Sequence, residues 1–541
     1  MNTPITLEMA QSALSGRIVP QAARAVTPEL IIEVVARQYD VTPDDLIGKN
    51  RSQQIALPRQ VAMYLCRRMT NLSTTRIGQA FGGRDHTTVL HGCDKVAESM
   101  NADFSFNRRV EELIGLIENF HFSEEDIEYL ASLKIFEQDF LDYLREFRFT
   151  GDIYAIPEGN VMFPREPVVK VCAPIMQAQL LETALLNIIN HQSLIATKAS
   201  RVVYAARGDG VMEFGLRRAQ GPDAGTYGAR AAVIAGCIGT SNVKTGRMFG
   251  VPVKGTHAHS WVMSFPDEYT AFKTYADLYP NACILLVDTY DTLGSGVPNA
   301  IRVFDEMKAK GVKLSYYGIR LDSGDLAYLS KKARKMLDDA GYTDAVISAS
   351  SDLDEYLITS LKIQGAQITS WGVGTNLITS KDCPSFGGVY KLVAMQDKET
   401  GEFIPKIKVS ENTEKITNPG DKKIYRIYSK ETGKIIADQI CLNDEVIDEN
   451  EDLLLFDPVD TWKKTMCLKG TYTARELLVP VFRKGICVYE SPDVMEIREN
   501  CKKEMDTLWE ETKRLTNPHN VYVDLSRKLY DTKQALLDSA R

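Results

Sequence analysis

Apolar residues near the start of the chain recur at helical spacing and predict a set of short helices. Thr27 and Pro28 are a typical N-cap and first-turn pair for a helix over Val26–Arg37. The same spacing predicts helices over Pro58–Met69 and over Ser73–Ala80, the latter with Ser73 as N-cap. A fourth helix is predicted from Asp85 onward, with Val89, Cys93, Val96 and Met100 on one face. Because the turn Phe81-Gly82-Gly83-Arg84 precedes it, the pattern is typical of a helix-turn-helix.

Later in the chain, short apolar runs alternate with helical stretches such as Pro298–Lys310 and Leu326–Ala340. The apolar runs are Val211–Phe214, Val251–Val253, Cys283–Val287, Tyr316–Ile319, Val346–Ala349 and Trp371–Val373. Repeated strand and helix units predict parallel strands, and we favour a barrel over an open doubly wound sheet. Hairpins over Gly151–Pro174, with strands near Ile404–Tyr428 and Val479–Tyr489, predict a smaller accessory domain.

Composition places the chain among ordinary globular proteins. Its 541 residues are enough for several domains, and 44% are hydrophobic and 25% charged. No apolar run approaches the length that spans a bilayer, and the N-terminus lacks a signal pattern, so we expect a cytoplasmic protein without a membrane partner. The ten cysteines include no Cys-x-x-Cys pair. This spacing argues against zinc ribbons and disulfide frameworks and fits a reducing compartment.

Charge is distributed unevenly. The net charge of −8 disfavours nucleic-acid binding by the molecule as a whole, yet Lys49–Arg84 contains seven basic residues and no acidic one. Such a stripe is either an electrostatic footprint for phosphates or a solvated basic face. In a helix-turn-helix the first residues of the second helix face the base edges, and here these are Asp85, His86, Thr87 and Thr88. The alternative is that Asp85 only caps the helix and the threonines are merely exposed.

Polar residues or glycines follow each predicted strand of the later region. They are Arg217 with Arg218, His257 with His259, Asp288, Arg320 with Asp322, Ser350-Ser351-Asp352, and Gly374-Thr375. Barrel enzymes gather their chemistry at the carboxyl ends of the strands, so this distribution predicts a catalytic site. Guanidinium groups suit carboxylates or phosphates, and carboxylates suit a magnesium diphosphate and a ribose. The two histidines could form a metal pair, but with no third ligand nearby we favour one reactive imidazole.

Part of the N-terminal region resembles a known DNA-binding domain. Arg51-Ser52, Pro58–Leu65, Ile77-Gly78 and Phe81–Leu90 together resemble the C-terminal domain of the bacterial replication initiator DnaA. The resemblance implies that Arg51 enters the minor groove of a DnaA box in double-stranded DNA and that Arg67 contacts a phosphate. It also implies that Asp85, His86, Thr87 and Thr88 read the major groove. Thr3–Gly16 resembles the tail of the initiator's AAA+ lid, but the chain has no phosphate-binding loop of that ATPase, so the resemblance implies DNA binding without origin melting.

The later region resembles nicotinate phosphoribosyltransferase. The segments that carry the resemblance, in order, are Phe214–Gly225, Gly255–Trp261, Asp288–Thr292, Arg320–Asp325, Gly372–Thr375 and Asn517–His519. This family joins nicotinate to phosphoribosyl diphosphate in a step of NAD salvage, with Mg²⁺ present and ATP hydrolysis coupled through a phosphohistidine.

The resemblance assigns a role to individual residues. It implies that His259 is the phosphorylated histidine and that the catalytic Asp288 and Asp322 lie beside the ribose and metal. It implies that Phe214 stacks on the pyridine ring and that Arg217, Thr240 and Arg320 bind substrate. It further implies that Ser351, Gly374 and Thr375 seat the 5′-phosphate. No residue is assigned as a metal ligand.

Together these features predict a multidomain protein. We expect a lid remnant at residues 1–25, an all-α helix-turn-helix domain at 26–117, and an α/β phosphoribosyltransferase region at 118–541. The last comprises an irregular α/β barrel over about 175–395 and an α+β accessory domain from 118–174 and the C-terminal part. The family's opening segment, whose tyrosine stacks on nicotinate across a dimer, is replaced by the initiator-like module. The main hypothesis is therefore a nicotinate phosphoribosyltransferase with a DNA-binding module. The alternatives are a DnaA-box-binding protein with an inactive transferase region, and a join that is never expressed.

Overall fold

The computed structural model describes residues 27–38, 41–48, 53–69, 72–90, 117, 120–411 and 416–540. The chain separates into two compact units, Met1–Phe106 and Asn107–Arg541. The predictions that concern residues 1–25, Arg51 and the helix beyond residue 90 lie outside the described residues.

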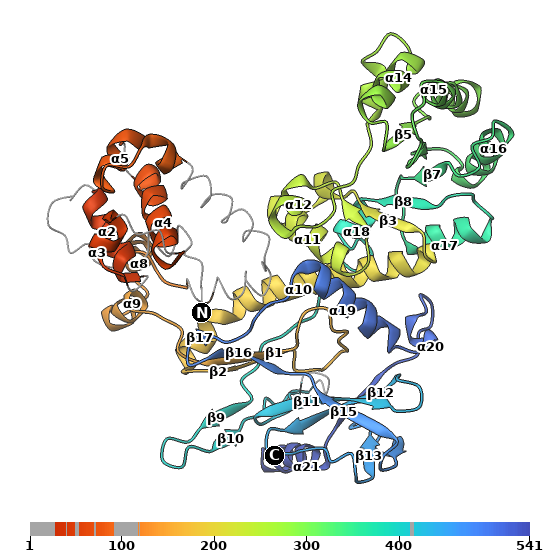
Figure 1. Cartoon of the computed structure of the whole chain (residues 1–541). Helices are drawn as coiled ribbons and strands as arrows, with labels where there is room; N and C mark the ends of the chain where they lie inside the picture. The colour runs from red at the N-terminus through yellow and green to blue at the C-terminus, as the bar shows by residue number, and fades with distance from the viewer. Residues whose placement is uncertain are drawn as a thin grey trace. The chain divides into compact units, whose positions relative to one another are not determined.

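The first unit is helical, as the apolar spacing predicts (Figure 1). Its helices are α2 (Pro28–Gln38), α3 (Pro43–Ile47), α4 (Gln53–Met69) and α5 (Thr74–Ala80), and a further helical stretch runs over residues 86–90. Their apolar faces meet in one core that includes Ile31, Leu46, Leu65, Ile77 and Phe81.

Two helix boundaries in this unit differ from the sequence-based expectation. Helix α4 begins at Gln53 and contains Pro58, whereas the apolar spacing predicts a helix that starts at Pro58. A proline inside a helix removes one backbone hydrogen bond, and the long buried face that follows Pro58 outweighs that loss. Helix α3 was not predicted; a capping box between Thr42 and Asp45 starts it.

The turn between α5 and residue 86 requires glycine. Gly82 and Gly83 both have positive φ, at 79° and 75°. At Gly78, inside α5, a Cβ atom would lie 2.1 Å from the carbonyl oxygen of Arg84. The backbone of the turn therefore packs directly against the helix, and this contact sets the angle between the two helices.

The second unit contains a six-stranded parallel sheet whose strands follow the order β4-β3-β8-β7-β6-β5. The strands are β3 (Gly210–Glu213), β4 (Gly239–Thr240), β5 (Cys283–Leu286), β6 (Tyr317–Leu321), β7 (Val346–Ala349) and β8 (Ser370–Val373). If the strands are followed around the ring from β3 to β4 and then from β5 to β8, each strand is succeeded by the next one in the chain. A doubly wound sheet reverses its strand order at a switch point, so the sequential order identifies an irregular barrel.

The barrel does not close with strand pairing between β4 and β5. The segment 251–257 fills this gap instead: Val253 forms an isolated bridge with Thr240, and His257 Nε2 accepts a hydrogen bond of 3.2 Å from the backbone N–H of Leu286. The prediction of a full strand over Val251–Val253 was therefore wrong, and the two-residue strand β4 was missed. Both segments are too short for periodicity to reveal them.

Helices cover the outside of the barrel. They are α10 (Ile175–Ala206), α11 (Pro222–Ile234), α12 (Val243–Phe249), α13 (His259–Met263), α14 (Glu268–Leu278), α15 (Val297–Ala309), α16 (Leu326–Asp339), α17 (Glu355–Ile363) and α18 (Thr375–Ile378). A single large apolar core lies between these helices and the strands. None of the helices in the described part of the chain has both the length and the apolar character required to cross a membrane.

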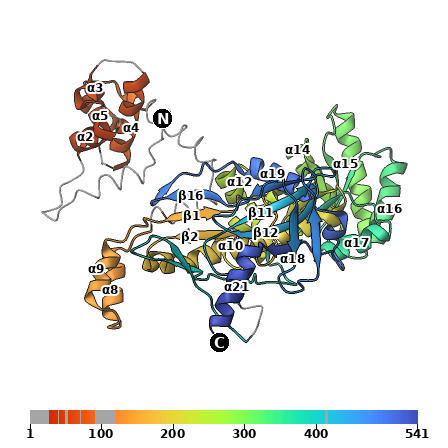
Figure 2. The same cartoon turned by 90° about the horizontal axis from the view of Figure 1, so that it is seen from below.

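The accessory domain is built from segments before and after the barrel. The predicted hairpin is β1 (Asp152–Ala155) with β2 (Val169–Cys172), and β1 also pairs with β16 (Val479–Arg483), which pairs with β17 (Ile486–Cys487). Helix α10 runs along this sheet (Figure 2), and Leu181 and Leu185 pack on Ile153 and Phe482. Strands β16 and β17 lie within the predicted segment Val479–Tyr489 and extend the sheet of this hairpin.

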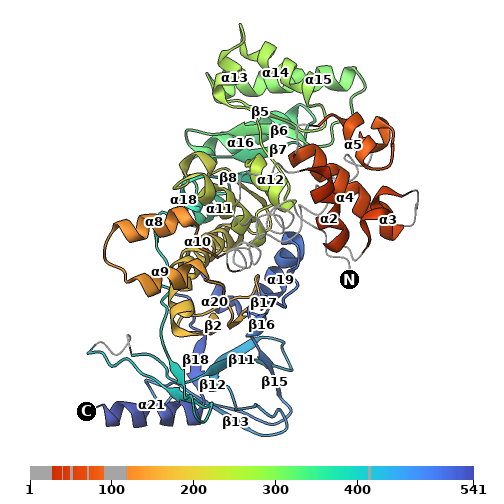
Figure 3. The ribbon, with the colours of Figure 1, turned by 90° about the vertical axis from the view of Figure 1, so that its left-hand side faces the viewer.

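A second sheet of the accessory domain has the order β15-β11-β12-β18. Its strands are β11 (Lys422–Ser429), β12 (Ile435–Leu442), β15 (Tyr472–Glu476) and β18 (Tyr522–Leu525). Two small pairs accompany it, β9 (Ala394–Gln396) with β10 (Phe403–Pro405) and β13 (Leu453–Phe456) with β14 (Lys464–Cys467). The remaining helices are α8 (Glu124–Ser132), α9 (Gln138–Arg145), α19 (Val494–Asp506), α20 (Glu510–Lys513) and α21 (Arg527–Ser539) (Figure 3).

A buried ion cluster joins this second sheet to its surroundings. Arg426 is fully buried and lies 2.7 Å from Asp438, 3.4 Å from Glu504 and 3.6 Å from Glu166. Burial, together with the neighbouring Asp438, raises the pKa of Glu166 to about 10. Glu166 is therefore protonated at neutral pH, which leaves two carboxylates facing the guanidinium.

Candidate functional site

Charged side chains converge at the carboxyl ends of β5, β6 and β7, as the strand pattern predicts. Arg320, near the end of β6, donates hydrogen bonds of 2.7 Å to Ser350 Oγ, 2.7 Å to Thr256 Oγ1 and 3.0 Å to Asp322 Oδ1. Ser350 in turn donates a hydrogen bond to Asp322. Burial acts to raise the pKa of Asp322, but the hydrogen bond from Ser350 and the charge of Arg320 hold it below its usual value. Asp322 is thus anionic at neutral pH.

Asp288 follows β5, and only 2% of its side-chain surface is exposed. Its Oδ2 atom accepts hydrogen bonds from the backbone N–H of Asp322 (2.9 Å) and from the hydroxyl of Ser323 (2.7 Å). Its Oδ1 atom accepts no hydrogen bond from any described residue and lies 4.0 Å from His259 Nε2. One carboxylate oxygen is therefore fixed by the protein, and the other is buried without a hydrogen-bond partner among the described residues.

The two histidines have different environments, which rules out the metal-pair alternative in this structure. His257 is buried against Phe272 and Tyr275, and burial lowers its pKa to about 4. His259 begins helix α13 and is partly exposed; its Nδ1 lies 3.1 Å from Thr289 Oγ1 and its Nε2 lies 3.5 Å from Asp322 Oδ2. A single imidazole therefore faces the carboxylates.

Phe214 and Arg217 lie at the end of β3. The Phe214 ring covers Gly372, where a Cβ would lie 2.6 Å from the ring, and the guanidinium carbon of Arg320 is 5.9 Å from the ring centroid. Arg217 is exposed in the short turn after β3. The loop thus places one aromatic ring beside Arg320 and carries the exposed guanidinium of Arg217.

The fully buried Glu213 supports this loop from behind. Its carboxylate accepts hydrogen bonds from the Gly215 backbone N–H and from the Thr240 hydroxyl, the latter at 2.6 Å, and burial raises its pKa. Thr240 is also fully buried. In this geometry Thr240 supports Glu213 and offers no exposed atom to a ligand, unlike the direct substrate contact expected from the sequence.

The predicted phosphate seat lies at the ends of β7 and β8. Ser351 is exposed and has a φ of 130°, a backbone conformation that non-glycine residues rarely adopt. Gly374 and Thr375 begin the short helix α18, with Gly374 as its N-cap. Backbone N–H groups at a helix start are suited to an anion.

Sequence reasoning assigned no role to four residues that support the site. Ser350, Thr256 and Ser323 form hydrogen bonds within the charged cluster, and Glu213 accepts hydrogen bonds in the loop beside it. Each stands directly beside a predicted residue in the sequence. A signal was therefore present, but only the three-dimensional arrangement shows which neighbour makes the contact.

In the first unit, the four predicted base-reading residues lie together at the helix start after the glycine turn. Asp85, His86, Thr87 and Thr88 are all exposed. Asp85 Oδ1 accepts hydrogen bonds from the backbone N–H (2.8 Å) and the hydroxyl (3.0 Å) of Thr87, so Asp85 also caps the helix. Arg67, on α4, is exposed as well.

Two residues of the basic stripe have a structural role instead. Arg59 is buried and donates hydrogen bonds to the carbonyl oxygens of Leu46 (2.7 Å) and Asp45 (2.6 Å) at the end of α3. Arg84 donates to the carbonyl of Gly48. The counted stripe therefore overstates the charge that is available to a DNA backbone.

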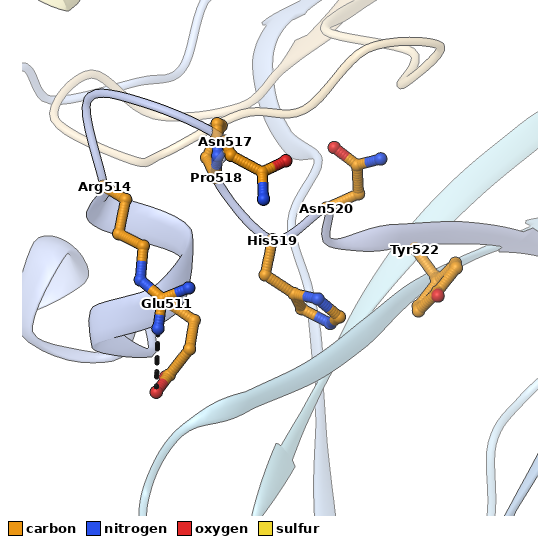
Figure 4. Close-up of a pocket in the computed structure, with 7 residues that line it drawn as sticks. All are labelled: Glu511, Arg514, Asn517, Pro518, His519, Asn520 and Tyr522. Carbon is orange, nitrogen blue, oxygen red and sulfur yellow. Dashed lines mark ion pairs between the residues drawn. The ribbon is translucent and has the colours of Figure 1, made fainter.

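The Asn517-Pro518-His519 segment lines a pocket of about 250 Å³ between α20 and β18 (Figure 4). Glu511 and Arg514 form an ion pair of 3.7 Å on one side of it. All seven lining residues are exposed, and none of them belongs to the cluster at the barrel strand ends. This pocket is therefore separate from the candidate active site.

Comparison with known proteins agrees with this geometry. Three family models match successive parts of the chain: the nicotinate phosphoribosyltransferase N-terminal domain at residues 97–190, the nicotinate phosphoribosyltransferase family at 210–431, and the C-terminal domain at 421–533. A nicotinate phosphoribosyltransferase of Bacillus subtilis is 49% identical over 424 residues, which cover 78% of this chain and 85% of the relative. The chain belongs to the nicotinate phosphoribosyltransferase family.

Other relatives extend this result. A nicotinate phosphoribosyltransferase of Dictyostelium discoideum is 36% identical and covers 81% of this chain and 82% of the relative. The crystal structure of human nicotinic acid phosphoribosyltransferase superposes with a TM-score of 0.67 at 28% identity, over 80% of this chain and 91% of that one. The family consists of enzymes, and the barrel with its accessory domain is the fold that they share.

The N-terminal unit matches a different family. The bacterial DnaA protein helix-turn-helix model matches residues 28–96, directly before the transferase models begin. The chain is thus a phosphoribosyltransferase fused to a DnaA-type helix-turn-helix domain. The family models meet at residues 96 and 97, and the join predicted from the sequence lies at residues 117 and 118.

Proposed function

We propose that the transferase region joins nicotinate to phosphoribosyl diphosphate and couples this reaction to ATP hydrolysis. The products are nicotinate mononucleotide, diphosphate, ADP and phosphate. The observation that carries the proposal is the cluster of Arg320, Asp288, Asp322 and His259 at the carboxyl ends of the barrel strands. In this reaction the bond from the ribose C1 to the diphosphate oxygen breaks, diphosphate leaves with the electron pair, and the nicotinate ring nitrogen bonds to C1.

The charges of the cluster suit this displacement. As the leaving group departs, the ribose acquires positive charge, which the anionic Asp322 and the neighbouring carboxyl group of Asp288 stabilise. Arg320 is held by Ser350, Thr256 and Asp322 and so presents a fixed positive charge to a phosphate group. Because these side chains are held before substrate arrives, they need little reorganisation during the reaction.

Mg²⁺ fits the same carboxylates. Asp288 keeps one buried oxygen free of hydrogen bonds while its other oxygen is fixed, and carboxylate oxygens are preferred Mg²⁺ ligands. We propose that Asp288 and Asp322 would hold the ion. When bound, Mg²⁺ neutralises charge on the departing diphosphate.

The loops around the cluster supply the remaining contacts. Phe214 would stack on the pyridine ring of nicotinate, and the exposed Arg217 would pair with its carboxylate. Ser351, Gly374 and Thr375 would seat the 5′-phosphate at the start of α18. Thr240 would act through Glu213, by holding the loop that carries Phe214.

His259 would accept a phosphoryl group from ATP, since it is the imidazole that faces both carboxylates. A His259→Ala variant should lose the stimulation by ATP and retain some ATP-independent turnover. Wild-type ATP dependence in that variant would contradict the role of His259.

Diphosphate release tests the reaction as a whole. Purified full-length protein with nicotinate, phosphoribosyl diphosphate, ATP and Mg²⁺ should release diphosphate, and omission of nicotinate should stop the release. Lack of release at high enzyme concentration would defeat the proposal and favour the alternative of an inactive transferase region.

We further propose that the helix-turn-helix domain binds DnaA-box-like double-stranded DNA. The exposed Asp85, His86, Thr87 and Thr88 at the start of one helix support this second function. A His86→Ala variant should lose its preference for box DNA more than its affinity for scrambled DNA, because base contacts specify the sequence while phosphate contacts position the protein. Equal losses on both DNAs in a gel-shift assay would refute base reading by His86.

Arg67 provides the matched comparison, as an exposed basic residue on α4. Arg67→Ala should weaken binding to box and scrambled DNA alike and reduce the salt dependence of binding by about one phosphate contact. A wild-type protein without preference for box DNA would remove this second function and leave the transferase assignment unaffected.

A further inference from the structure

The two ring nitrogens of His259 have different neighbours. Nδ1 lies 3.1 Å from the hydroxyl oxygen of Thr289. Nε2 lies 3.5 Å from Asp322 Oδ2 and 4.0 Å from Asp288 Oδ1. Thr289 directly follows Asp288 at the end of β5, so the same strand end positions the hydroxyl and the carboxylate.

This difference matters because a neutral imidazole carries a proton on only one nitrogen. The nitrogen that carries the proton has no free lone pair and cannot attack phosphorus. The hydrogen bond at one nitrogen therefore decides which nitrogen is the nucleophile. At His259, the partner of Nδ1 is a hydroxyl oxygen that can accept the Nδ1 proton.

We propose that Thr289 is a positioning residue that makes Nε2 of His259 the phosphoryl acceptor. The inference rests on the proposed ATP coupling. Thr289 Oγ1 accepts a hydrogen bond from the Nδ1–H group, which leaves the lone pair of Nε2 free. Nε2 then bonds to the γ-phosphorus of ATP, the bond from that phosphorus to the bridging oxygen breaks, and ADP leaves with the electron pair.

Two features of the geometry favour this assignment. The Thr289 side chain covers the Nδ1 side of the ring, so a phosphoryl group has no room there while the contact persists. The ring gains positive charge as Nε2 bonds to phosphorus, and the carboxylates of Asp322 and Asp288 lie within 4.0 Å to stabilise that charge.

Phosphorus NMR distinguishes the two phosphohistidine isomers. The full-length protein is incubated with Mg²⁺ and ATP, denatured in alkali, where phosphohistidine survives, and its spectrum recorded. Wild type should show the Nε2 isomer alone. Thr289→Ser, which keeps the hydroxyl, should behave as wild type.

Two further variants separate the hydrogen bond from the shape of the side chain. Thr289→Val keeps the shape and loses the hydroxyl; its rate of phosphohistidine formation should fall about 2- to 12-fold, the effect of one net hydrogen bond. Thr289→Ala also uncovers Nδ1 and should yield some of the Nδ1 isomer. Thr274→Ala is the control and should match wild type, because the Thr274 hydroxyl on α14 donates a hydrogen bond to the Thr270 carbonyl oxygen of the same helix.

ATP-independent diphosphate release reports whether each variant is folded and whether the transferase reaction itself exists. Where that release is normal, either of two results overturns the inference. One is a wild-type protein that carries the phosphoryl group on Nδ1; the other is that Thr289→Val and Thr289→Ala match wild type in rate and isomer. Absence of any phosphohistidine in wild type overturns it together with the ATP coupling, while the release assay still decides the transferase reaction.

Discussion

Acidification should weaken the barrel at a single identifiable residue, His257. This side chain fills the gap between β4 and β5, where Nε2 accepts a hydrogen bond from the Leu286 backbone and can do so only when it carries no proton. Burial lowers its pKa to about 4. In the unfolded chain the pKa of a histidine is about 6.5.

The sign and size of the effect follow from these two values. Above pH 6.5 His257 is neutral in both states and its contribution to stability is complete. As the pH falls from 6.5 toward 4, the unfolded chain binds a proton that the folded protein does not, so the free energy of unfolding decreases. At pH 5 the loss from this residue is about 2 kcal/mol, and at pH 4 it reaches about 3 kcal/mol.

The comparison that isolates His257 is a substitution that cannot titrate. His257→Gln keeps a side chain able to accept the Leu286 N–H, and urea unfolding is followed at pH 7 and pH 5 for both proteins. Wild type should lose about 2 kcal/mol more than the variant between the two pH values. His519→Gln, at an exposed histidine, is the control and should lose as much as wild type. Equal losses in wild type and His257→Gln would refute the assignment of a buried neutral imidazole.

Three further predictions address other parts of the structure. Thr240→Val should destabilise the barrel by about 1–3 kcal/mol in denaturant unfolding, because it removes a buried hydrogen bond to Glu213. Glu166→Gln should leave thermal stability nearly unchanged, since Glu166 is already protonated. Arg426→Met should lower the free energy of unfolding by about 3–5 kcal/mol, because it leaves buried carboxylates unpaired. Equal losses of stability in the two variants would contradict the ion cluster. Gly78→Ala should unfold the helix-turn-helix domain in circular dichroism, because its Cβ would lie 2.1 Å from a backbone oxygen.

Much of the fold could be predicted from the pattern of apolar residues. The strands β3, β5, β6, β7 and β8 lie within a residue or two of the predicted runs, because each is long enough and buried enough to leave a continuous apolar signal. The segment 251–257 could not be predicted correctly. Its role in closing the barrel depends on a hydrogen bond that the His257 side chain accepts from the Leu286 backbone N–H, and such a contact leaves no periodic signal.

The residues of the candidate site, too, could be predicted only in part. Asp288, Asp322, Arg320 and His259 could be named from their positions after strands, and the structure brings them together. Thr240 was expected to touch substrate but is buried behind Glu213, since a residue's distance from a strand end does not report the direction of its side chain. The structural roles of Arg59 and Arg84 were hidden for a related reason: a count of charges does not show which of them are already paired with backbone carbonyls.

The most direct test of the central claim compares wild type with Asp322→Asn in product formation from nicotinate and phosphoribosyl diphosphate. Wild type should form nicotinate mononucleotide and diphosphate in equal amounts, and Asp322→Asn should be slower by about 100-fold or more, as expected when one preorganised charge at the reacting centre is lost. Failure of wild type to form nicotinate mononucleotide, or a wild-type rate for Asp322→Asn, would contradict the account.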